Sequence, residues 1–258
     1  MIKLSAVTYP VRNPIFKEIT LSFNEGEITA IIGRSGSGKS AFLNLLSLNN
    51  KVRPQISGSI YLKGKPALTL GQKETTKLIA HSDIVPENMD ELLDNFLLLS
   101  RVPHKKMFAP FLEYDLKLTD SFIERFELSP FRKYPLNSLT TSFFKRTLLA
   151  FSFIREADVI LFDNPTANLD FYGIKILYKE LIKSVISGKR SVIIASHDIN
   201  FIAEIADRIL ILENGQIAED IHPDKLDKKA LKKYLSVETI ISKNIYNGRP
   251  LVHLFPDD

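Results

Sequence analysis

A run of eight residues beginning at Gly33 has the composition of a phosphate-binding loop. It matches the pattern G-x-x-x-x-G-K-S in full, and its members are Gly33, Arg34, Ser35, Gly36, Ser37, Gly38, Lys39 and Ser40. The glycines allow backbone N–H groups to point inward around phosphates, and the start of a following helix adds a favourable dipole. Lys39 would neutralise the β and γ phosphates, and the Ser40 hydroxyl would hold Mg²⁺. The run therefore predicts a site for a nucleotide with its metal ion.

A carboxylate follows an apolar run further along the chain. Residues 159–162 are Val, Ile, Leu and Phe, and Asp163 comes directly after them. An aspartate in such a place is often only a turn or cap residue. With a phosphate loop upstream, the pattern favours the aspartate that lies on the Mg²⁺ side of a bound nucleotide. We therefore expect Ser40 and Asp163 to be the metal-side residues.

The elements that must position these residues are short buried strands. Apolar runs occur at Ile28–Ile32, at residues 159–162 and at Ser191–Ala195, and each precedes polar residues and a helical pattern. Strands buried on both faces and separated by helices imply a mostly parallel sheet of the α/β class. Because ligands bind at the carboxyl ends of such strands, residues 33–40, 163–170 and 196–198 should lie together.

Other stretches predict elements around this core. Between about residues 87 and 156, apolar residues recur at helical spacing and prolines interrupt them, which predicts an inserted α-helical subdomain. Alternating apolar residues near the start, with Ile60 and Leu62 later, predict a flanking antiparallel β subdomain. After Gly215 we expect a short strand, and from residue 221 to 258 a lysine-rich helix that ends in a polar tail.

Composition narrows the classes of protein that the chain can belong to. Its 258 residues are 45% hydrophobic and 25% charged, which suits one large globular unit. It has no cysteine, so disulfides, thiolate metal sites and thiol nucleophiles are excluded. A net charge of +4 is small for a nucleic-acid binder, and no nucleic acid is expected. No apolar run approaches the roughly 18 residues of a membrane span, and no signal peptide is expected.

Two further motifs resemble those of the ATP-binding cassette (ABC) family. Residues 164–170 read N-P-T-A-N-L-D after one predicted strand, and residues 196–198 read S-H-D after the next. The first is similar to the end of the Walker B segment with the D-loop, and the second to the switch-histidine loop. The resemblance reaches about residue 220 and implies a P-loop NTPase (RecA-like) fold that binds ATP and Mg²⁺.

The resemblance also implies roles for individual residues. His197 would contact the γ-phosphate, and Asn164 stands where the family has a catalytic glutamate. Tyr9 is placed like the aromatic residue that stacks on adenine, although a tyrosine there is also common as a core residue. Asn164 can orient a water molecule but cannot take its proton, which predicts a loss of about 10²–10⁴ in hydrolysis rate.

The family signature is altered as well. Leu139, Thr140, Thr141, Ser142 and Phe143 occupy the place of leucine-serine-glycine-glycine-glutamine, before a helix expected over residues 147–153. Thr140 keeps a hydroxyl, but Thr141 and Ser142 resist the close backbone approach that glycines allow. The segment is alternatively only a serine- and threonine-capped helix start. The family's glutamine before the helical subdomain is absent, with Ser82 or Asp83 in its place.

These features predict an ATP-binding subunit of an ABC membrane transporter. Its partners would be separate transmembrane subunits and a second ABC ATPase subunit, with a heterodimer favoured over a homodimer. It would be cytoplasmic, peripheral on the cytoplasmic face of the cell membrane. The alternatives are a regulatory nucleotide sensor that does not transport and a soluble ABC protein acting on the ribosome or DNA. The D-loop and histidine motifs disfavour a small-molecule kinase.

Overall fold

A computed structural model of the whole chain gives the fold. The structure describes residues 1–82, 86, 88–106, 108–187 and 190–255. Asp83, one of the two candidates for the glutamine position, lies outside the described residues. Within the described ranges, no helix is long and apolar enough to cross a membrane.

A six-stranded sheet forms the centre of the molecule, in the order β10-β9-β3-β8-β7-β6. Its strands are β3 (Ile28–Ile32), β6 (Ile79–His81), β7 (Val159–Asp163), β8 (Ser191–Ala195), β9 (Arg208–Glu213) and β10 (Gln216–Ile221). All neighbours pair in parallel except β9 and β10. Because β3, β8 and β7 are adjacent, the loops that follow them meet at one edge, as the sequence predicts.

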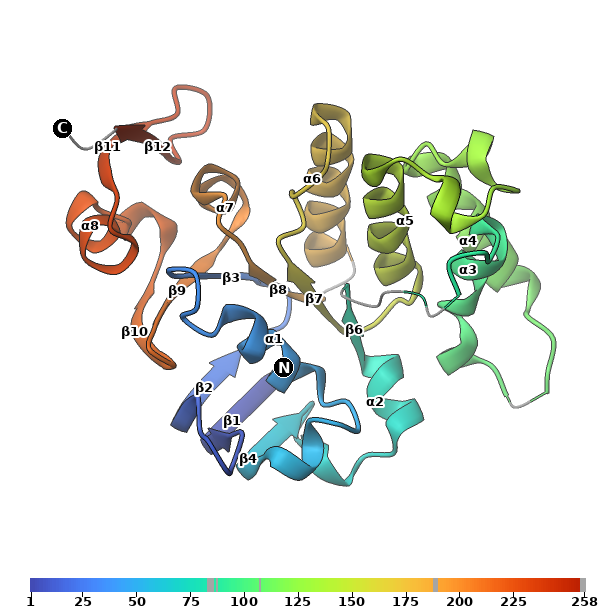
Figure 1. Cartoon of the computed structure of the whole chain (residues 1–258), viewed down its shortest axis with the longest axis horizontal. Helices are drawn as coiled ribbons and strands as arrows, with labels where there is room; N and C mark the ends of the chain where they lie inside the picture. The colour runs from blue at the N-terminus through green and yellow to red at the C-terminus, as the bar shows by residue number, and fades with distance from the viewer. Residues whose placement is uncertain (83–85, 87, 107, 188–189, 256–258) are drawn as a thin grey trace.

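A smaller antiparallel sheet covers one face of the central sheet. It has the order β2-β1-β4-β5 and consists of β1 (Ile2–Tyr9), β2 (Phe16–Phe23), β4 (Ser57–Leu62) and β5 (Lys65–Pro66). Helix α1 (Lys39–Ser47) lies between the two sheets (Figure 1), and Phe42 packs among Phe16 and Phe23. The flanking β subdomain is thus present, and its hydrophobic face closes over the helix that begins at the phosphate loop.

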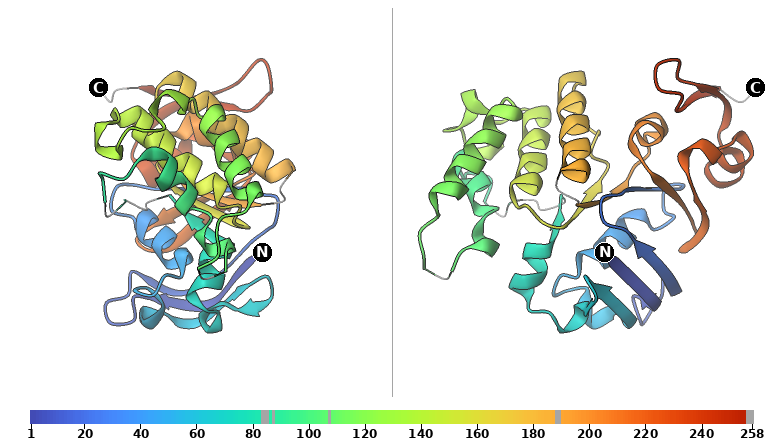
Figure 2. Two further views of the ribbon diagram at one scale, coloured as in Figure 1. Left: turned by 90° about the vertical axis from the view of Figure 1, so that its right-hand side faces the viewer. Right: turned by 180° about the vertical axis from the view of Figure 1, so that it is seen from behind.

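Helices cover the opposite face of the central sheet. They are α5 (Thr141–Ile154), α6 (Phe171–Ile186) and α7 (Ile199–Ile205), with α3 (Leu93–Leu99) and α4 (Glu113–Arg125) packed against α5. Helix α2 (Gln72–Leu78) leads into β6 on the side of the smaller sheet (Figure 1), and its Leu78 packs against the core of that sheet. Seen from front and behind, α5 and α6 lie side by side, and α3 and α4 extend beyond them as the inserted helical region (Figures 1 and 2). Phe153 at the centre contacts Phe122, Phe126 and Phe162, which joins this region to the sheet.

A buried ionic cluster anchors the helical region near its junction with the sheet. Arg101 is 3% exposed, and its guanidinium donates to Asp115 Oδ1 (2.8 Å), Ile154 O (2.8 Å) and Glu156 Oε2 (3.0 Å). Burying a charge without such partners costs several kcal/mol. The three acceptors therefore allow the Arg101 guanidinium to be buried. The 3₁₀ turn Val102–His104 follows at once, so it is tied to the segment that leads into β7.

The C-terminal part differs from the expected polar tail. After helix α8 (Lys228–Leu235), strands β11 (Glu238–Lys243) and β12 (Pro250–Phe255) form an antiparallel hairpin. Val252 is 3% exposed within the main core, which the sequence expectation missed. The alternating apolar pattern of the hairpin is short and surrounded by polar residues. Its apolar face is therefore evident only in the structure, where β12 packs against α7.

Candidate nucleotide-binding site

The phosphate loop connects β3 to α1 with a backbone that suits glycine at two places. A Cβ atom on Gly33 would lie 2.4 Å from the carbonyl oxygen of Leu212, which is closer than any side chain allows. Gly38 precedes α1 with φ 105°, a conformation that other residues rarely adopt. The N-terminus of α1 therefore opens directly into the loop, where its dipole favours an anion.

Lys39 is buried within this loop. Its Nζ atom donates to the carbonyl oxygens of Gly33 (2.8 Å) and Arg34 (2.9 Å). Burial lowers the pKa of the Lys39 ammonium, and the negative charge of Asp163 partly opposes the shift. Ser37 Oγ is also buried, without a hydrogen-bond partner in the described part of the chain. A buried ammonium and an unpartnered hydroxyl within a glycine loop fit a polyphosphate group.

Asp163, Asn164 and His197 are brought together at the ends of β7 and β8. Asn164 has φ 43°, which asparagine tolerates better than most residues. Its side-chain amide donates from Nδ2 to Asp163 Oδ1 (3.1 Å), and its Oδ1 accepts from the backbone N–H of His197 (3.3 Å). Asn164 thus connects the other two residues through both ends of its amide group.

The remaining residues of the loop are more accessible. Ser40 is exposed on the first turn of α1, and Ser35 and Gly36 are exposed before it. Ser40 and Asp163 offer only oxygen atoms, which is the donor type that Mg²⁺ prefers. The Arg34 side chain donates to the hydroxyl of Ser236, at the C-terminal end of α8.

Tyr9 lies in the core of the flanking sheet, as one of its two alternatives predicts. Its ring is 6% exposed, lies parallel to Phe16 with centroids 6.5 Å apart, and belongs to the core cluster of the flanking sheet. Its hydroxyl accepts a hydrogen bond from Asn44 Nδ2 (3.4 Å). A ring packed in this way supports the core alternative, and a role of Tyr9 in stacking on adenine stays a prediction.

The altered signature segment leads into a helix longer than expected. Helix α5 begins at Thr141, six residues before the expected start, and Thr140 precedes it with extended backbone. Five residues into the helix, the buried Arg146 donates to both carboxylate oxygens of Asp170 (2.6 and 2.8 Å). Asp170 in turn caps α6 through the N–H of Gly173. This bidentate pair was not predicted, and it connects the signature helix to the loop after Asn164.

Ser82 is the described candidate for the glutamine position. It is 4% exposed, and its Oγ accepts a hydrogen bond from the backbone N–H of Asp163 at 3.4 Å. A buried serine held in this way supports the end of β7 and does not reach outward. The assignment of the position therefore stays a prediction.

A comparison with protein families shows which family this chain belongs to. The model of the family described as "ABC transporter" matches residues 16–167, more than half of the chain. This chain belongs to the ABC transporter family. A putative ABC transporter ATP-binding protein of Listeria monocytogenes is 30% identical over 210 residues, covering 79% of this ABC chain and 74% of the relative. The arginine transport ATP-binding protein ArtM of Bacillus subtilis is 29% identical, covering 82% and 87%.

Other relatives are longer, and solved structures agree with the fold. A putative ABC transporter ATP-binding protein of Bacillus cereus is 27% identical over 83% of this ABC chain, which spans only 37% of that relative. A dimeric ATP-binding cassette in a post-hydrolysis state, bound to ADP and Pi, superimposes with a TM-score of 0.72 at 25% identity. The superimposed region covers 86% of this chain and 98% of the chain in that structure. The predicted P-loop NTPase fold is confirmed.

Neutral His197 is expected at physiological pH. Its pKa is lowered first by burial and then by the positive charge of Lys39, with Asp163 opposing. We expect an NMR titration of the ring to show a midpoint below about 6.5, assigned with His197→Gln. Because protonation then favours the unfolded chain, the contribution of His197 to stability falls as pH decreases below about 6.5. A midpoint that does not rise in Lys39→Ala would contradict the electrostatic part of this account.

Proposed function

We propose that this chain is the ATP-binding subunit of an ABC membrane transporter with weak hydrolysis of its own. The observation that carries the proposal is the meeting of the phosphate loop, Asp163 and His197 at one edge of the sheet. ATP would lie with its phosphates around Lys39, and Ser40 and Asp163 would hold Mg²⁺. The names of two relatives, an arginine transport protein and a petrobactin import protein of Bacillus anthracis, support uptake.

The impaired chemistry follows from two departures. Asn164 has no carboxylate, and both ends of its amide are already used within the site, by Asp163 and by the backbone of His197. At α5, Thr141 and Ser142 carry side chains where close approach to the opposite subunit's nucleotide is needed. In a head-to-tail dimer each nucleotide lies between one subunit's phosphate loop and the other subunit's signature. The missing base and the poor cap of this chain would therefore affect different nucleotide sites. A heterodimer with an intact second cassette subunit would therefore keep one site with its base.

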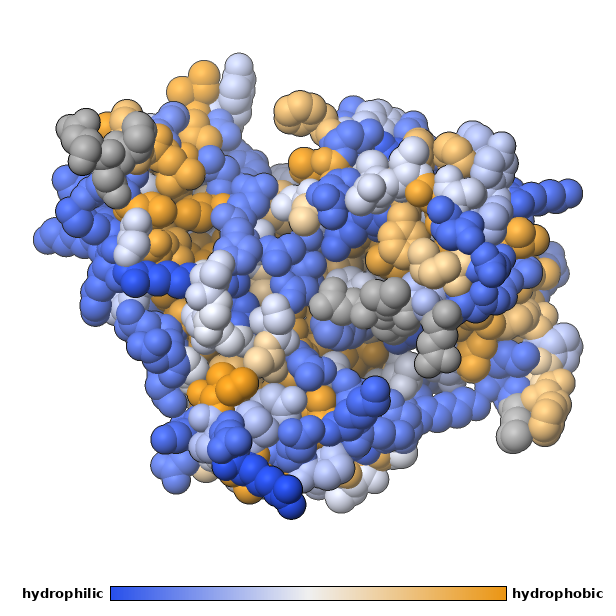
Figure 3. Space-filling view, in the orientation of Figure 1, coloured by the Kyte–Doolittle hydropathy of each residue, from blue (hydrophilic) through white to orange (hydrophobic). Residues whose placement is uncertain are grey.

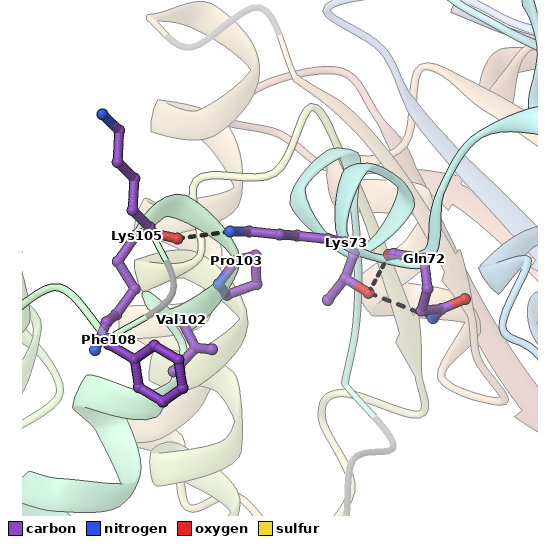
Figure 4. A pocket seen from close by; sticks show the side chains of 8 residues that line it. Gln72, Lys73, Val102, Pro103, Lys105 and Phe108 are labelled. Carbon is purple, nitrogen blue, oxygen red and sulfur yellow. Dashed lines mark hydrogen bonds between the residues drawn. The ribbon is translucent and has the colours of Figure 1, made fainter.

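A groove beside the helical region offers a docking place for the transmembrane subunit. It has a volume of 540 Å³ and is lined by Gln72, Lys73, Thr76, Val102, Pro103, Lys105, Lys106 and Phe108. Figure 4 shows Lys73 reaching across it to the carbonyl oxygen of Lys105 (2.7 Å), with Val102 and Phe108 on the far wall. Figure 3 shows apolar side chains gathered over the helical region, at the right of the view, as well as over the C-terminal segment.

The residues that line the groove indicate which side chains its binding partner should have. The Phe108 side chain is 92% exposed and Val102 is 45% exposed, so both would gain from burial against a partner. The described residues around the groove include three lysines and no acidic residue. A short helix of the transmembrane subunit with an apolar tip and acidic flanks fits this surface. Attachment here would place the chain on the cytoplasmic face of the membrane.

Replacing Phe108 with aspartate tests this function. The tagged chain is purified from gently solubilised membranes with Mg²⁺ and ATP, and the proteins that accompany it are identified. We expect a polytopic membrane protein with the native chain and at least about a tenfold lower yield of it with Phe108→Asp, since an apolar contact becomes a buried charge. ATP affinity should not change, because the groove is outside the nucleotide site.

Ile245→Asp is the matched control for this experiment. Ile245 is 88% exposed and lies in the C-terminal hairpin, at the other end of the molecule from the helical region (Figure 1). It should recover the membrane protein like the native chain. Recovery of the native chain with soluble partners only would reject the transporter function and favour a nucleotide sensor.

A further inference from the structure

The C-terminal segment, residues 226–255, lies against the nucleotide site. A pocket of 280 Å³ separates the two, and its walls come from three places. Gly33, Arg34 and Ser35 belong to the phosphate loop, and Ser196 and His197 belong to the loop after β8. The third wall is apolar and is formed by Leu235, Val237 and Leu254 of the C-terminal segment.

A hydrogen-bonded contact joins the segment to the phosphate loop. The Arg34 guanidinium donates to the hydroxyl of Ser236 and to the carbonyl oxygen of Lys233 (3.4 Å). Ser236 ends α8 in the left-handed conformation with φ 57°, and Lys233 belongs to the last turn. The last carbonyl groups of a helix are unpaired and carry partial negative charge, so this is a favourable place for a cation.

A second contact joins the segment to the helix that follows His197. The Asn200 side chain pairs with the backbone of Val252, donating from Nδ2 (3.0 Å) and accepting at Oδ1 (2.8 Å). At the other end of α7, Arg249 donates to the carbonyl oxygens of Ala203 (3.3 Å) and Ala206 (2.8 Å). The segment is thus bonded both to the phosphate loop and to α7, the helix that follows the loop of His197.

Arg34 is therefore a cation with two competing partners, one of partial and one of full negative charge. One is the C-terminal end of α8, which holds it in this structure. The other is the phosphate end of a nucleotide, since Arg34 and His197 line the same pocket and His197 is the proposed γ-phosphate contact. A full negative charge attracts a guanidinium more strongly than a helix terminus and a hydroxyl do.

We infer that Ser236 positions Arg34 and makes the site distinguish ATP from ADP. The γ-phosphate withdraws Arg34 from α8 and loosens the C-terminal segment, whereas ADP leaves the contact in place. By linkage, whatever weakens the contact strengthens the binding of ATP by the same factor. The inference rests on the proposed nucleotide site and adds a regulation that the transporter function does not require.

Ser236→Gly tests the inference without disturbing the helix end. Glycine favours the left-handed conformation that Ser236 adopts, so α8 keeps its cap while Arg34 loses its hydroxyl acceptor. We expect ATP affinity to rise about two- to tenfold, the range for a partly exposed charged hydrogen bond, and ADP affinity to stay unchanged. Ser236→Asn, which tolerates the same backbone and restores an acceptor, should return ATP affinity to the native value.

Hydrogen exchange of the full chain supplies the second readout. In the native chain, ATP with Mg²⁺ should accelerate exchange of peptides from α8 relative to ADP, and in Ser236→Gly the two nucleotides should give equal exchange. Ser242→Ala, in the same segment but with its hydroxyl bonded to His253, should behave as the native chain. Equal exchange with ATP and ADP in the native chain, or equal changes in both affinities in Ser236→Gly, would overturn the inference. Absence of binding of either nucleotide would instead overturn the proposed function.

Discussion

Asn164→Glu is expected to raise ATP turnover by about 10²–10⁴, the usual contribution of a positioned general base. Asn164 follows Asp163 at the end of β7, where its side chain already lies between Asp163 and the loop of His197. A carboxylate there can accept the proton of an attacking water, which the amide cannot. The measurement is phosphate release with the membrane partner present, so that an intact opposite signature can cap the site.

The matched control for this change is Asn164→Gln. It has the length of glutamate and the same strain at φ 43°, which costs on the order of 1–3 kcal/mol, but it adds no base. We expect its turnover to stay at the native level. Equal rates for the two variants would show that a missing base does not limit turnover, and the poor cap at Thr141 and Ser142 would become the explanation.

Lys39→Ala should lower ATP affinity by about 10²-fold or more, because a buried cation that pairs with phosphate contributes 2–5 kcal/mol to binding. The free chain should remain folded. Lys39 Nζ donates to two loop carbonyls, and burying its charge is itself unfavourable. Isothermal titration with ATP and a thermal melt of the free chain measure the two effects separately.

Lys51→Ala is the control for the Lys39 variant. Lys51 is exposed in the loop after α1, outside the phosphate loop, and its removal should leave ATP affinity within a factor of two of the native value. If Lys39→Ala binds ATP as tightly as Lys51→Ala, the phosphate loop does not hold the nucleotide in the proposed way.

The central sheet and the phosphate loop could be predicted because both have local signals. Strand β3 is a short buried run that is apolar except for Thr29, and the glycines and lysine after it match a spacing that backbone geometry requires. The relation between Asp163 and His197 followed from strand order, since residues at the ends of adjacent parallel strands must meet. These predictions needed no knowledge of side-chain packing.

The features that the sequence left open or did not predict depend on contacts between distant parts of the chain. Tyr9 is an aromatic residue at a plausible place, but whether its ring faces a ligand or Phe16 is decided by the packing of two sheets. Arg146 and Asp170 are 24 residues apart, and no local pattern shows that they pair. The hairpin after α8 is likewise stabilised by Asn200 and Arg249 across α7, so its sequence alone resembles a polar tail.

The hydrogen bonds and ion pairs of Arg101 connect the proposed docking groove to the segment that leads into β7. Val102 and Pro103 in the groove follow Arg101 directly, and Arg101 and His104 are bonded to the backbone of Ile154 and Arg155. Four residues after Arg155 the chain enters β7, whose far end carries Asp163. If the groove binds a transmembrane subunit as proposed, a displacement there would reach Asp163, the proposed metal-side residue, through one strand and two hydrogen bonds. Movement of the membrane subunit and binding of the nucleotide would then be coupled through β7.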